Sequence, residues 1–345
     1  MKAAIIADLH LKMWSDDTFL EDGTPLKLKE IIDVVRDVCK YCLENHINTV
    51  IIAGDINDTK DSFSVRAFLL LRKVLEEFSD INWIILHGNH DLASNISSEV
   101  KYSAIELFDS LPNCKLILEP EILTVEDTEI LFVPYTNNIL AKIKQLSENL
   151  GQIKILIGHF GVNEAILSSG ISVKSDVSLQ DLKDFQLVIL GHYHKPQKIS
   201  NLYYVGSPIQ IRRDEVNEEK RFLDVDFDTL EVKSIETKGY RRYIELEIEN
   251  EDDLQKLDSI EVFDKKYIVV KLRANLNMDK RRYLEENCMV VDLTEENVES
   301  RGISLNMSLD EQLVKYLEYK NIVESDRQYY LDVVKECLGN SNNAI

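Results

Sequence analysis

Apolar residues at positions 1–240 form short continuous runs and longer runs with helical spacing. The continuous runs at 3–7, 49–53 and 83–86 are typical of buried strands, and each ends where polar residues begin. Helical spacing follows Pro25, which suits the first turn of a helix, and returns over 63–78. Helices early and consecutive strands late predict a layered α/β domain with mixed sheets over residues 1–240. Further strands are expected at 115–118, 130–134, 154–158, 187–190, 203–205 and 221–227.

The pattern changes near Gly239, and a smaller α/β unit is expected over residues 241–294. The polar stretch 295–307 is expected to be a linker, and residues 308–340 hold the pattern of two short amphipathic helices. Short helices cannot bury an apolar face alone, so this pair is expected to dock either on a partner protein or on its own globule. Within the small unit, strands are expected at 243–248, 267–272 and 289–293, with helices at 251–257 and 279–287.

Composition narrows the class of protein. The chain has 345 residues, of which 44% are hydrophobic, and this favours an ordered globular protein. We expect no transmembrane helix, because no apolar run reaches about eighteen residues, and no signal peptide. Five scattered cysteines favour reduced thiols in a cytoplasmic protein. The compact length suggests a bacterial or phage-infected cell. Cys39 and Cys42 have the spacing of half a zinc site, but their helical apolar context favours buried core.

Five short polar clusters follow predicted strands. Because the carboxyl ends of strands in α/β sheets bring loops together, these side chains are expected to converge. Burying acids and imidazoles there is costly unless they are paired or bind metal. His192 and His194 project to the same side of an extended segment, as do Asp8 and His10. The clusters are Asp8-Leu9-His10, Gly54-Asp55-Ile56-Asn57-Asp58, Gly88-Asn89-His90-Asp91, Gly158-His159 and Gly191-His192-Tyr193-His194.

This series resembles the motif order of the calcineurin-like metallophosphoesterase superfamily, which is D-x-H, G-D-x-x-D, G-N-H-D/E, G-H and G-H-x-H. All of these motifs are present between residues 8 and 194. Within the superfamily, the chain resembles the SbcD-type nuclease subunits of DNA double-strand-break repair, including phage recombination endonuclease subunits, through the segment Gly206-Ser207-Pro208. The resemblance implies a four-layer mixed β-sheet sandwich flanked by helices, with a small α/β capping domain and C-terminal helices.

The resemblance also implies two metal ions that share one carboxylate. Two divalent ions held in this way can activate water and offset the negative charge that develops on a reacting phosphate. Imidazoles mixed with oxygen ligands favour Mn, Fe or Zn over Mg, and the resemblance implies two Mn2+. By motif, one ion would be held by Asp8, His10 and His194, and the other by Asn89, His159 and His192, with Asp55 as the bridge.

Three further residues have expected roles outside the metal ligands. By resemblance, His90 protonates the leaving oxygen or steadies the phosphate, and a histidine side chain can serve as an acid near neutral pH. Asp91 would orient His90, as carboxylates beside active histidines do. Asp58 would either contact a metal ligand or cap the helix that begins near residue 63.

The resemblance implies a Mn-dependent DNA nuclease, with exonuclease action on double-stranded ends and endonuclease action on single strands. It implies an SbcC-type, SMC-like ATPase partner contacted by residues 308–338, and a homodimer formed through helices between the second motif and residue 110. The alternative is a metallophosphatase acting on a small-molecule or protein phosphoester, which the motifs alone allow. A scaffold without activity would have lost a ligand, and every expected ligand position is filled.

The net charge of −21 is the main objection to a nuclease. A strongly acidic surface repels phosphates on average. Binding of DNA would therefore be local and assisted by the metals, or a partner would supply much of the positive surface.

Overall fold

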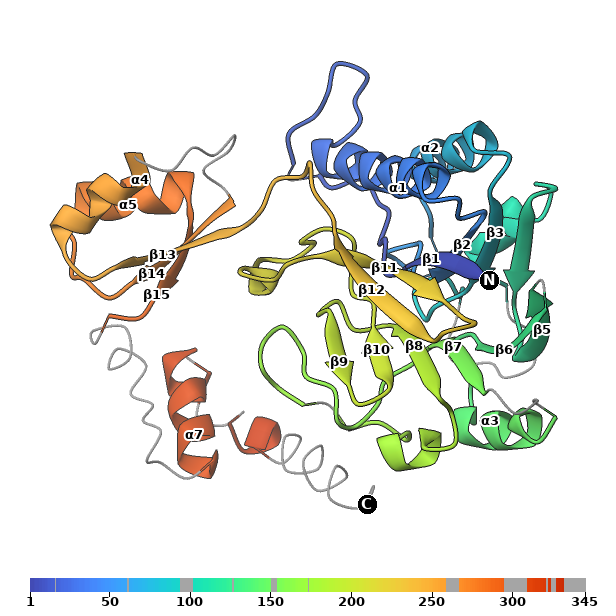
Figure 1. Ribbon diagram of the computed structural model, residues 1–345. Coiled ribbons are helices and arrows are strands. Elements are labelled where there is room, and N and C mark those ends of the chain that lie inside the picture. Colours follow the sequence, from blue (N-terminus) through green and yellow to red (C-terminus); the bar gives the residue numbers. More distant parts are fainter. Residues whose placement is uncertain are drawn as a thin grey trace. The chain divides into compact units, whose positions relative to one another are not determined.

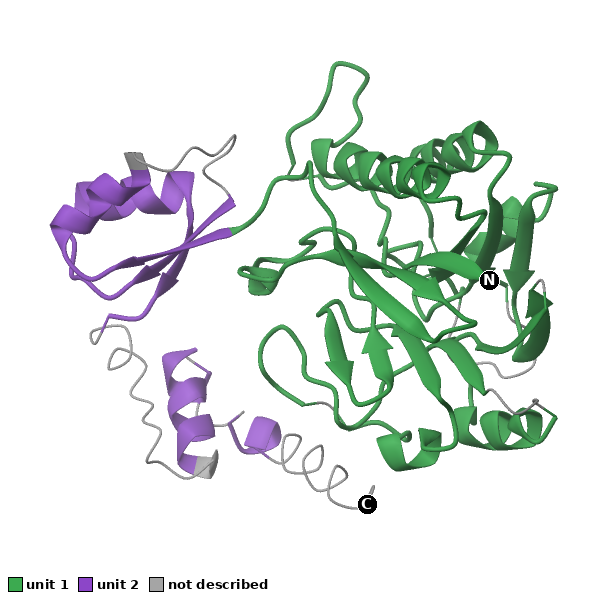
Figure 2. Ribbon diagram, viewed as in Figure 1, with its two compact units in different colours: residues 1–243 green, residues 244–345 purple. Residues whose placement is uncertain are grey.

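The computed structural model describes residues 1–331 apart from positions 16, 61, 94–101, 126, 150–153, 173, 259–266, 295–308, 321 and 324–326. It divides into two compact units, Met1–Tyr243 and Ile244–Ile345 (Figure 2). No helix in the described part of the chain is long and apolar enough to cross a membrane.

The first sheet of unit 1 has the strand order β12-β11-β1-β2-β3-β4 (Figure 1). Strands β1 to β4 are parallel to one another, whereas β11 pairs antiparallel with β1 and β12 antiparallel with β11. The parallel strands therefore all end at one edge of this sheet. The strands are β1 (Lys2–Ile6), β2 (Thr49–Ala53), β3 (Asn82–Leu86), β4 (Cys114–Ile117), β11 (Arg221–Asp226) and β12 (Glu231–Glu236).

The second sheet has the strand order β5-β6-β7-β8-β10-β9. Its four inner strands are parallel, and both edge strands pair antiparallel with their neighbours. Strands β7 and β8 are buried along their whole length, which fits their continuous apolar sequence. The strands are β5 (Glu121–Val125), β6 (Thr128–Val133), β7 (Ile155–His159), β8 (Leu187–Gly191), β9 (Gln197–Ile199) and β10 (Leu202–Tyr204).

The two sheets pack face to face between layers of helices, so the four-layer expectation is confirmed. One apolar core lies between the sheets, where side chains from β1, such as Ile5, meet side chains from β7, such as Ile157. A second core joins the first sheet to α1 (Leu26–Glu44) and α2 (Val65–Glu77). A third covers the outer face of the second sheet, where α3 (Ile139–Ser147) packs.

The two cysteines that raised the question of zinc belong to the helix core. Cys39 and Cys42 are both buried in α1 without a disulfide, among the residues that pack against the first sheet. Burial raises the pKa of Cys39 well above its usual range and that of Cys42 to about 12, so both remain neutral thiols. The expectation of buried core is confirmed.

Unit 2 contains a small parallel sheet of order β13-β14-β15 with its own apolar core. Its start at Ile244 lies close to the domain boundary expected at residue 240. The expected linker 295–307 and the two helix starts near 308 and 325 lie outside the described residues; helix α7 (Leu309–Tyr319) and a helical turn at 327–331 are described. The other elements are β13 (Ile244–Ile248), η4 (Glu251–Leu254), α4 (Gln255–Asp258), β14 (Ile268–Leu272), α5 (Met278–Asn287) and β15 (Met289–Asp292).

Candidate metal centre

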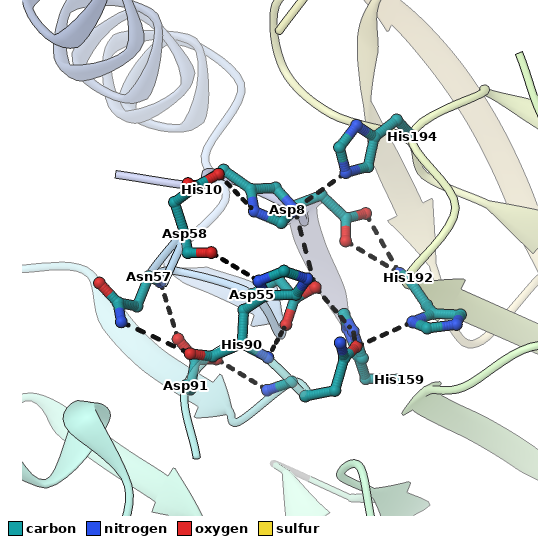
Figure 3. A network of polar contacts seen from close by, with 12 residues as sticks. Asp8, His10, Asp55, Asn57, Asp58, His90, Asp91, His159, His192 and His194 are labelled. Atoms are coloured by element: carbon teal, nitrogen blue, oxygen red, sulfur yellow. Dashed lines mark hydrogen bonds and ion pairs between the residues drawn. The ribbon is translucent and has the colours of Figure 1, made fainter. Parts of the chain in front are cut away.

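The five polar clusters meet at the carboxyl ends of parallel strands from both sheets. Strands β1, β2 and β3 of the first sheet and β7 and β8 of the second end at one place, and the loops that follow them carry the polar side chains. Figure 3 shows these side chains pointing toward one another from opposite sheets. The structure thus brings together all seven expected ligands and His90.

The first group of candidate ligands consists of Asp8, His10 and His194. One nitrogen or oxygen atom of each lies within 4.8 Å of the others. The Nε2 atoms of His10 and His194 are 2.9 Å apart, so two imidazoles from different sheets face one point. The Asp8 carboxylate accepts a hydrogen bond from the His192 backbone N–H at 2.9 Å, which links this group to the second.

The second group consists of Asn89, His159 and His192. The Asn89 Oδ1 atom lies 3.2 Å from His159 Nε2 and 3.0 Å from His192 Nδ1. His159 Nδ1 is 2.8 Å from the Ala53 carbonyl oxygen, to which it donates. That bond turns Nε2 of His159 toward Asn89 and Asp55, which is the nitrogen that would bind a metal ion in place of a proton.

Asp55 lies between the two groups. Its Oδ2 atom is 3.3 Å from His159 Nε2 and 3.7 Å from His10 Nε2. Its Oδ1 atom accepts a hydrogen bond from the His90 backbone N–H at 2.8 Å. The carboxylate is buried and faces one histidine of each group, which is the position of a bridge.

The donor set fits two divalent cations better than it fits a network without metal. Asp8, His10, Asp55 and His159 are all buried, and close pairs of imidazole nitrogens cannot all share protons. His10 Nε2 and His194 Nε2 face each other at 2.9 Å. Each ring can hold its proton on Nδ1, toward Asp58 and Glu215, which leaves the two Nε2 lone pairs opposed. Cations would satisfy these lone pairs at once, because oxygen and imidazole nitrogen are ligands that Mn, Fe and Zn accept.

The backbone of the site is strained. Asp8, His10, Asp55 and His192 have positive φ angles of 55°, 46°, 52° and 101°, a region that non-glycine residues rarely adopt. Each such residue costs about 1–3 kcal/mol and persists only when its surroundings fix it. All four are candidate ligands, so the strained backbone that directs these side chains inward costs the fold stability.

Gly88 permits a very close approach of two loops in the site. A Cβ atom at this position would lie 2.1 Å from Asp55 Oδ1, so any side chain would displace the bridging carboxylate. The absence of a side chain lets the loop after β3 pass directly over Asp55. This requirement explains the glycine of the G-N-H-D motif.

His90 is held by a different neighbour from the one expected. Its ring Nδ1 donates to the Asp58 carbonyl oxygen at 2.6 Å, which leaves Nε2 as the reactive nitrogen. The Asp91 carboxylate is buried and accepts from the backbone N–H groups of Asn57, at 2.8 Å, and Gly88, at 2.7 Å. Asp91 therefore joins the loops after β2 and β3, and its bonds go to these amides and not to the His90 ring.

Asp58 contacts a candidate metal ligand. Its carboxylate lies 3.4 Å from His10 Nδ1 and 2.8 Å from Lys12 Nζ. The N-cap of α2 is Ser64, whose hydroxyl accepts from the Ala67 N–H, so the helix-cap alternative for Asp58 is wrong.

Burial and the close contacts between imidazoles and carboxylates set the pKa values of the site. Burial alone would raise the pKa of Asp55, but His159, His10 and His90 outweigh it and hold that pKa well below its usual range. Burial would lower the pKa of His159, yet Asp55 raises it to about 9. Burial, with the charge of His159, lowers the pKa of His192 to about 3. Burial and the nearby Asp55 raise the pKa of Asp91 to about 7.

Two cavities open onto the site. A cavity of about 310 Å³ is lined by Asp55, His90 and His194 together with Arg212, a cation at its mouth. A larger cavity of about 900 Å³ begins at Asn89 and His192 and extends along the loop before α3. A phosphate can thus reach the candidate ligands, and the chain attached to it has room alongside.

Two functional residues were missed in the sequence. Glu215 accepts a hydrogen bond from His194 Nδ1 at 2.7 Å, and Lys220 pairs with Glu215 at 2.9 Å. Both are buried, although they lie in a run of acidic and basic residues that reads as a solvated loop. Both residues follow Gly206-Ser207-Pro208 closely along the chain, and that segment was the only feature of the sequence that pointed to this loop.

Residues 1–196 match the family described as Calcineurin-like phosphoesterase. The chain is 24% identical over 343 residues to Exonuclease subunit 1 of Enterobacteria phage T4, covering 95% of this chain and 96% of the relative. It is 22% identical to the DNA double-strand break repair protein Mre11 of Sulfolobus acidocaldarius, covering 89% of each chain. It is 26% identical to the SbcD component of the nuclease SbcCD from Staphylococcus epidermidis, covering 67% of each.

Proposed function

This chain belongs to the calcineurin-like phosphoesterase family, and from that premise we propose that it is the nuclease subunit of a DNA repair or recombination complex. The family and the nuclease relatives make it a metal-dependent phosphodiesterase. The observation that carries the proposal is the extent of similarity to the phage exonuclease subunit, which covers 95% of this chain and so includes unit 2. A phosphatase that needed only the metal centre would not require similarity over the whole length.

The cofactor that we propose is a pair of Mn2+ ions, with Fe, Zn or Mg as the alternatives. Asp8, His10 and His194 would hold one ion, and Asn89, His159 and His192 the other, with Asp55 shared. When bound, such ions activate water and stabilise negative charge on the phosphate. The mixed nitrogen and oxygen donors, with a neutral amide among them, support this class of metal over Mg.

The protein groups would position the ester and supply a proton. His90 borders the cavity at the metal centre, and its Nε2 is left available by the bond from Nδ1 to Asp58. It would donate a proton to the leaving oxygen or hold a phosphate oxygen. Arg212 at the mouth of the same cavity would attract the phosphate backbone.

We propose exonuclease action on double-stranded ends and endonuclease action on single strands, with an SMC-like ATPase of the SbcC type as partner. Exposed aromatic residues on helix α7, Tyr316 and Tyr319, with exposed fractions of 43% and 47%, support a docking role for this helix. We also propose that unit 2 is a capping or DNA-binding domain.

A homodimer through the α2 region is also part of the proposal. Exposed apolar side chains cluster around a cavity of about 430 Å³ that Phe63, Tyr102 and Leu107 line. Leu69, 51% exposed, lies on the same helix as Val65, 63% exposed. A second copy of the chain would cover such a patch. Leu69→Asp should turn a dimer into a monomer in light scattering, and a wild-type monomer would refute this part.

The function is tested by incubating the purified chain with Mn2+ and either linear duplex or single-stranded DNA, with Asp55→Asn as the inactive control. We expect metal-dependent cleavage by the wild type and none by the variant. The net charge of −21 favours the second candidate, a phosphatase. Rapid hydrolysis of a phosphomonoester, with no cleavage of DNA in the presence or absence of the ATPase, would establish that candidate instead.

A further inference from the structure

A buried acid lies behind the metal ligand His194. Glu215 is 1% exposed, and its Oε1 atom is 2.7 Å from His194 Nδ1. Its Oε2 atom accepts from the Ile211 backbone N–H at 2.9 Å and pairs with Lys220 Nζ at 2.9 Å. Every oxygen of this carboxylate is thus engaged, so the side chain has no freedom to move away from the imidazole.

Lys220 holds the same ligand from its backbone. It is 0% exposed, and its Nζ donates to the His194 carbonyl oxygen at 2.9 Å. It also pairs with Glu218 at 2.7 Å. A buried ion pair adds little net stability, because removing both charges from water costs about as much as their attraction returns. An apolar pair of similar volume would serve the fold about as well, so the choice of charged residues favours a role at His194.

The segment Gly206-Ser207-Pro208 closes on the same point. The Ser207 backbone N–H donates to the His194 carbonyl oxygen at 3.1 Å, and the Ser207 hydroxyl lies 3.3 Å from Glu215 Oε2. Gly206 has a φ of +82°, and a Cβ atom there would lie 2.7 Å from the His194 carbonyl oxygen. Three separate parts of the loop between β10 and β11 thus converge on one histidine.

We propose that Glu215 is a positioning residue that fixes His194 as a metal ligand. Lys220 and the Gly206–Ser207 backbone hold the main chain of His194 in place. The bond to Glu215 keeps the proton on Nδ1, so that the Nε2 lone pair faces His10 Nε2, 2.9 Å away. The carboxylate also makes the imidazole a stronger donor to a cation. This inference rests on the proposed two-metal centre.

The test is calorimetric titration of the metal-free chain with Mn2+. Glu215→Ala should weaken one of the two binding events by about 10–100-fold and leave the other near its wild-type affinity. A general folding defect would weaken both events together. Glu218→Gln is the matched control, because it removes the charge of one partner of Lys220 and leaves the bond between Glu215 and His194 intact. It should bind both ions as the wild type does.

Glu215→Ala leaves Lys220 with a partner missing and is at risk of unfolding. The double variant Glu215→Leu with Lys220→Met removes both buried charges at similar volume, and such replacements are often tolerated. It should fold and show the same weakened event. Wild-type affinity for both ions in a folded variant would overturn the role of Glu215 alone. A wild-type chain that binds no Mn2+ would overturn the metal centre and this inference with it.

Discussion

Replacing His90 by alanine shows whether this residue is a metal ligand or a general acid, because its position allows either role. One ring nitrogen of His90 lies within 4.8 Å of ligand atoms of His10 and Asp55, so the histidine is close enough to be a ligand. Its Nδ1, however, is already bonded to the Asp58 carbonyl oxygen at 2.6 Å. We expect it to act on the substrate as an acid, and loss of a general acid lowers a rate by about 10²–10⁴-fold.

This loss corresponds to about 3–5 kcal/mol of transition-state stabilisation. The assay compares DNA with bis(p-nitrophenyl) phosphate, whose leaving group needs no proton. His90→Ala should lose the full factor on DNA and much less on the activated diester, while elemental analysis finds wild-type metal content. His46, an exposed histidine outside the site, gives the matched control His46→Asn, because asparagine tolerates its φ of +56°, and this variant should change neither activity. Loss of one metal from His90→Ala, or equal losses on both substrates, would refute the role of acid.

Three further changes test the geometry and the charges of the site. Mn2+ affinity should rise with pH by about tenfold per unit up to pH about 9, because metal must displace the proton that Asp55 holds on His159. Calorimetry at several pH values measures this dependence, and an affinity that does not change with pH would contradict it. Gly88→Ala should lose metal, since its Cβ would lie 2.1 Å from Asp55 Oδ1. Gly170→Ala strains a backbone with a φ of +81°, but its Cβ meets nothing within 4 Å, so it should keep the metal and controls for backbone strain alone. Glu215 has its pKa lowered from 4.5 to about 2, so it stabilises the fold above pH 4.5. That contribution of about 3 kcal/mol is lost as pH falls toward 2. The free energy of unfolding, measured by denaturation at several pH values, should therefore fall less steeply over this range for Glu215→Gln than for the wild type.

The strands and helices that the sequence predicts well are those with continuous or strongly periodic apolar residues. Strands such as β2 and β8 are buried on both faces, and their uninterrupted runs leave no alternative. The strands that the sequence did not predict are β5, β9 and β12, all at sheet edges. Each has exposed or half-buried positions, so polar residues interrupt its pattern. Helix α3 was missed for a related reason, because only Ile143 is buried in it.

Spacing identified the residues that meet at the site, but it could not assign their hydrogen bonds. Asp91 follows His90 directly, and the sequence suggested that it orients that ring. The loop after β3 instead turns the Asp91 carboxylate toward the Asn57 and Gly88 amides. Glu215 was not predicted for the opposite reason. Its neighbours along the chain are charged and exposed, and only the burial of the loop against His194 distinguishes it.

The acidic charge of −21 is compatible with a nuclease once the local pairs are considered. Near the site, Asp58 is neutralised by Lys12 and Glu215 by Lys220, each through a direct ion pair. Asp8, Asp55 and the buried Asp91 then remain near the two proposed divalent ions, whose four positive charges exceed three carboxylates. A centre loaded with two such ions would therefore attract phosphate even though the whole surface repels it.

The metal-free centre has no such excess, so DNA binding should depend on metal loading to a greater degree than in a basic nuclease. A DNA-binding titration with and without Mn2+ at low salt measures this dependence. Equal affinity in the two conditions would mean that positive charge elsewhere, such as Arg212 at the cavity mouth, is sufficient to hold the phosphate backbone. A large difference would mean that the protein surface contributes little, and that a positively charged partner must supply what a long duplex requires beyond the two ions.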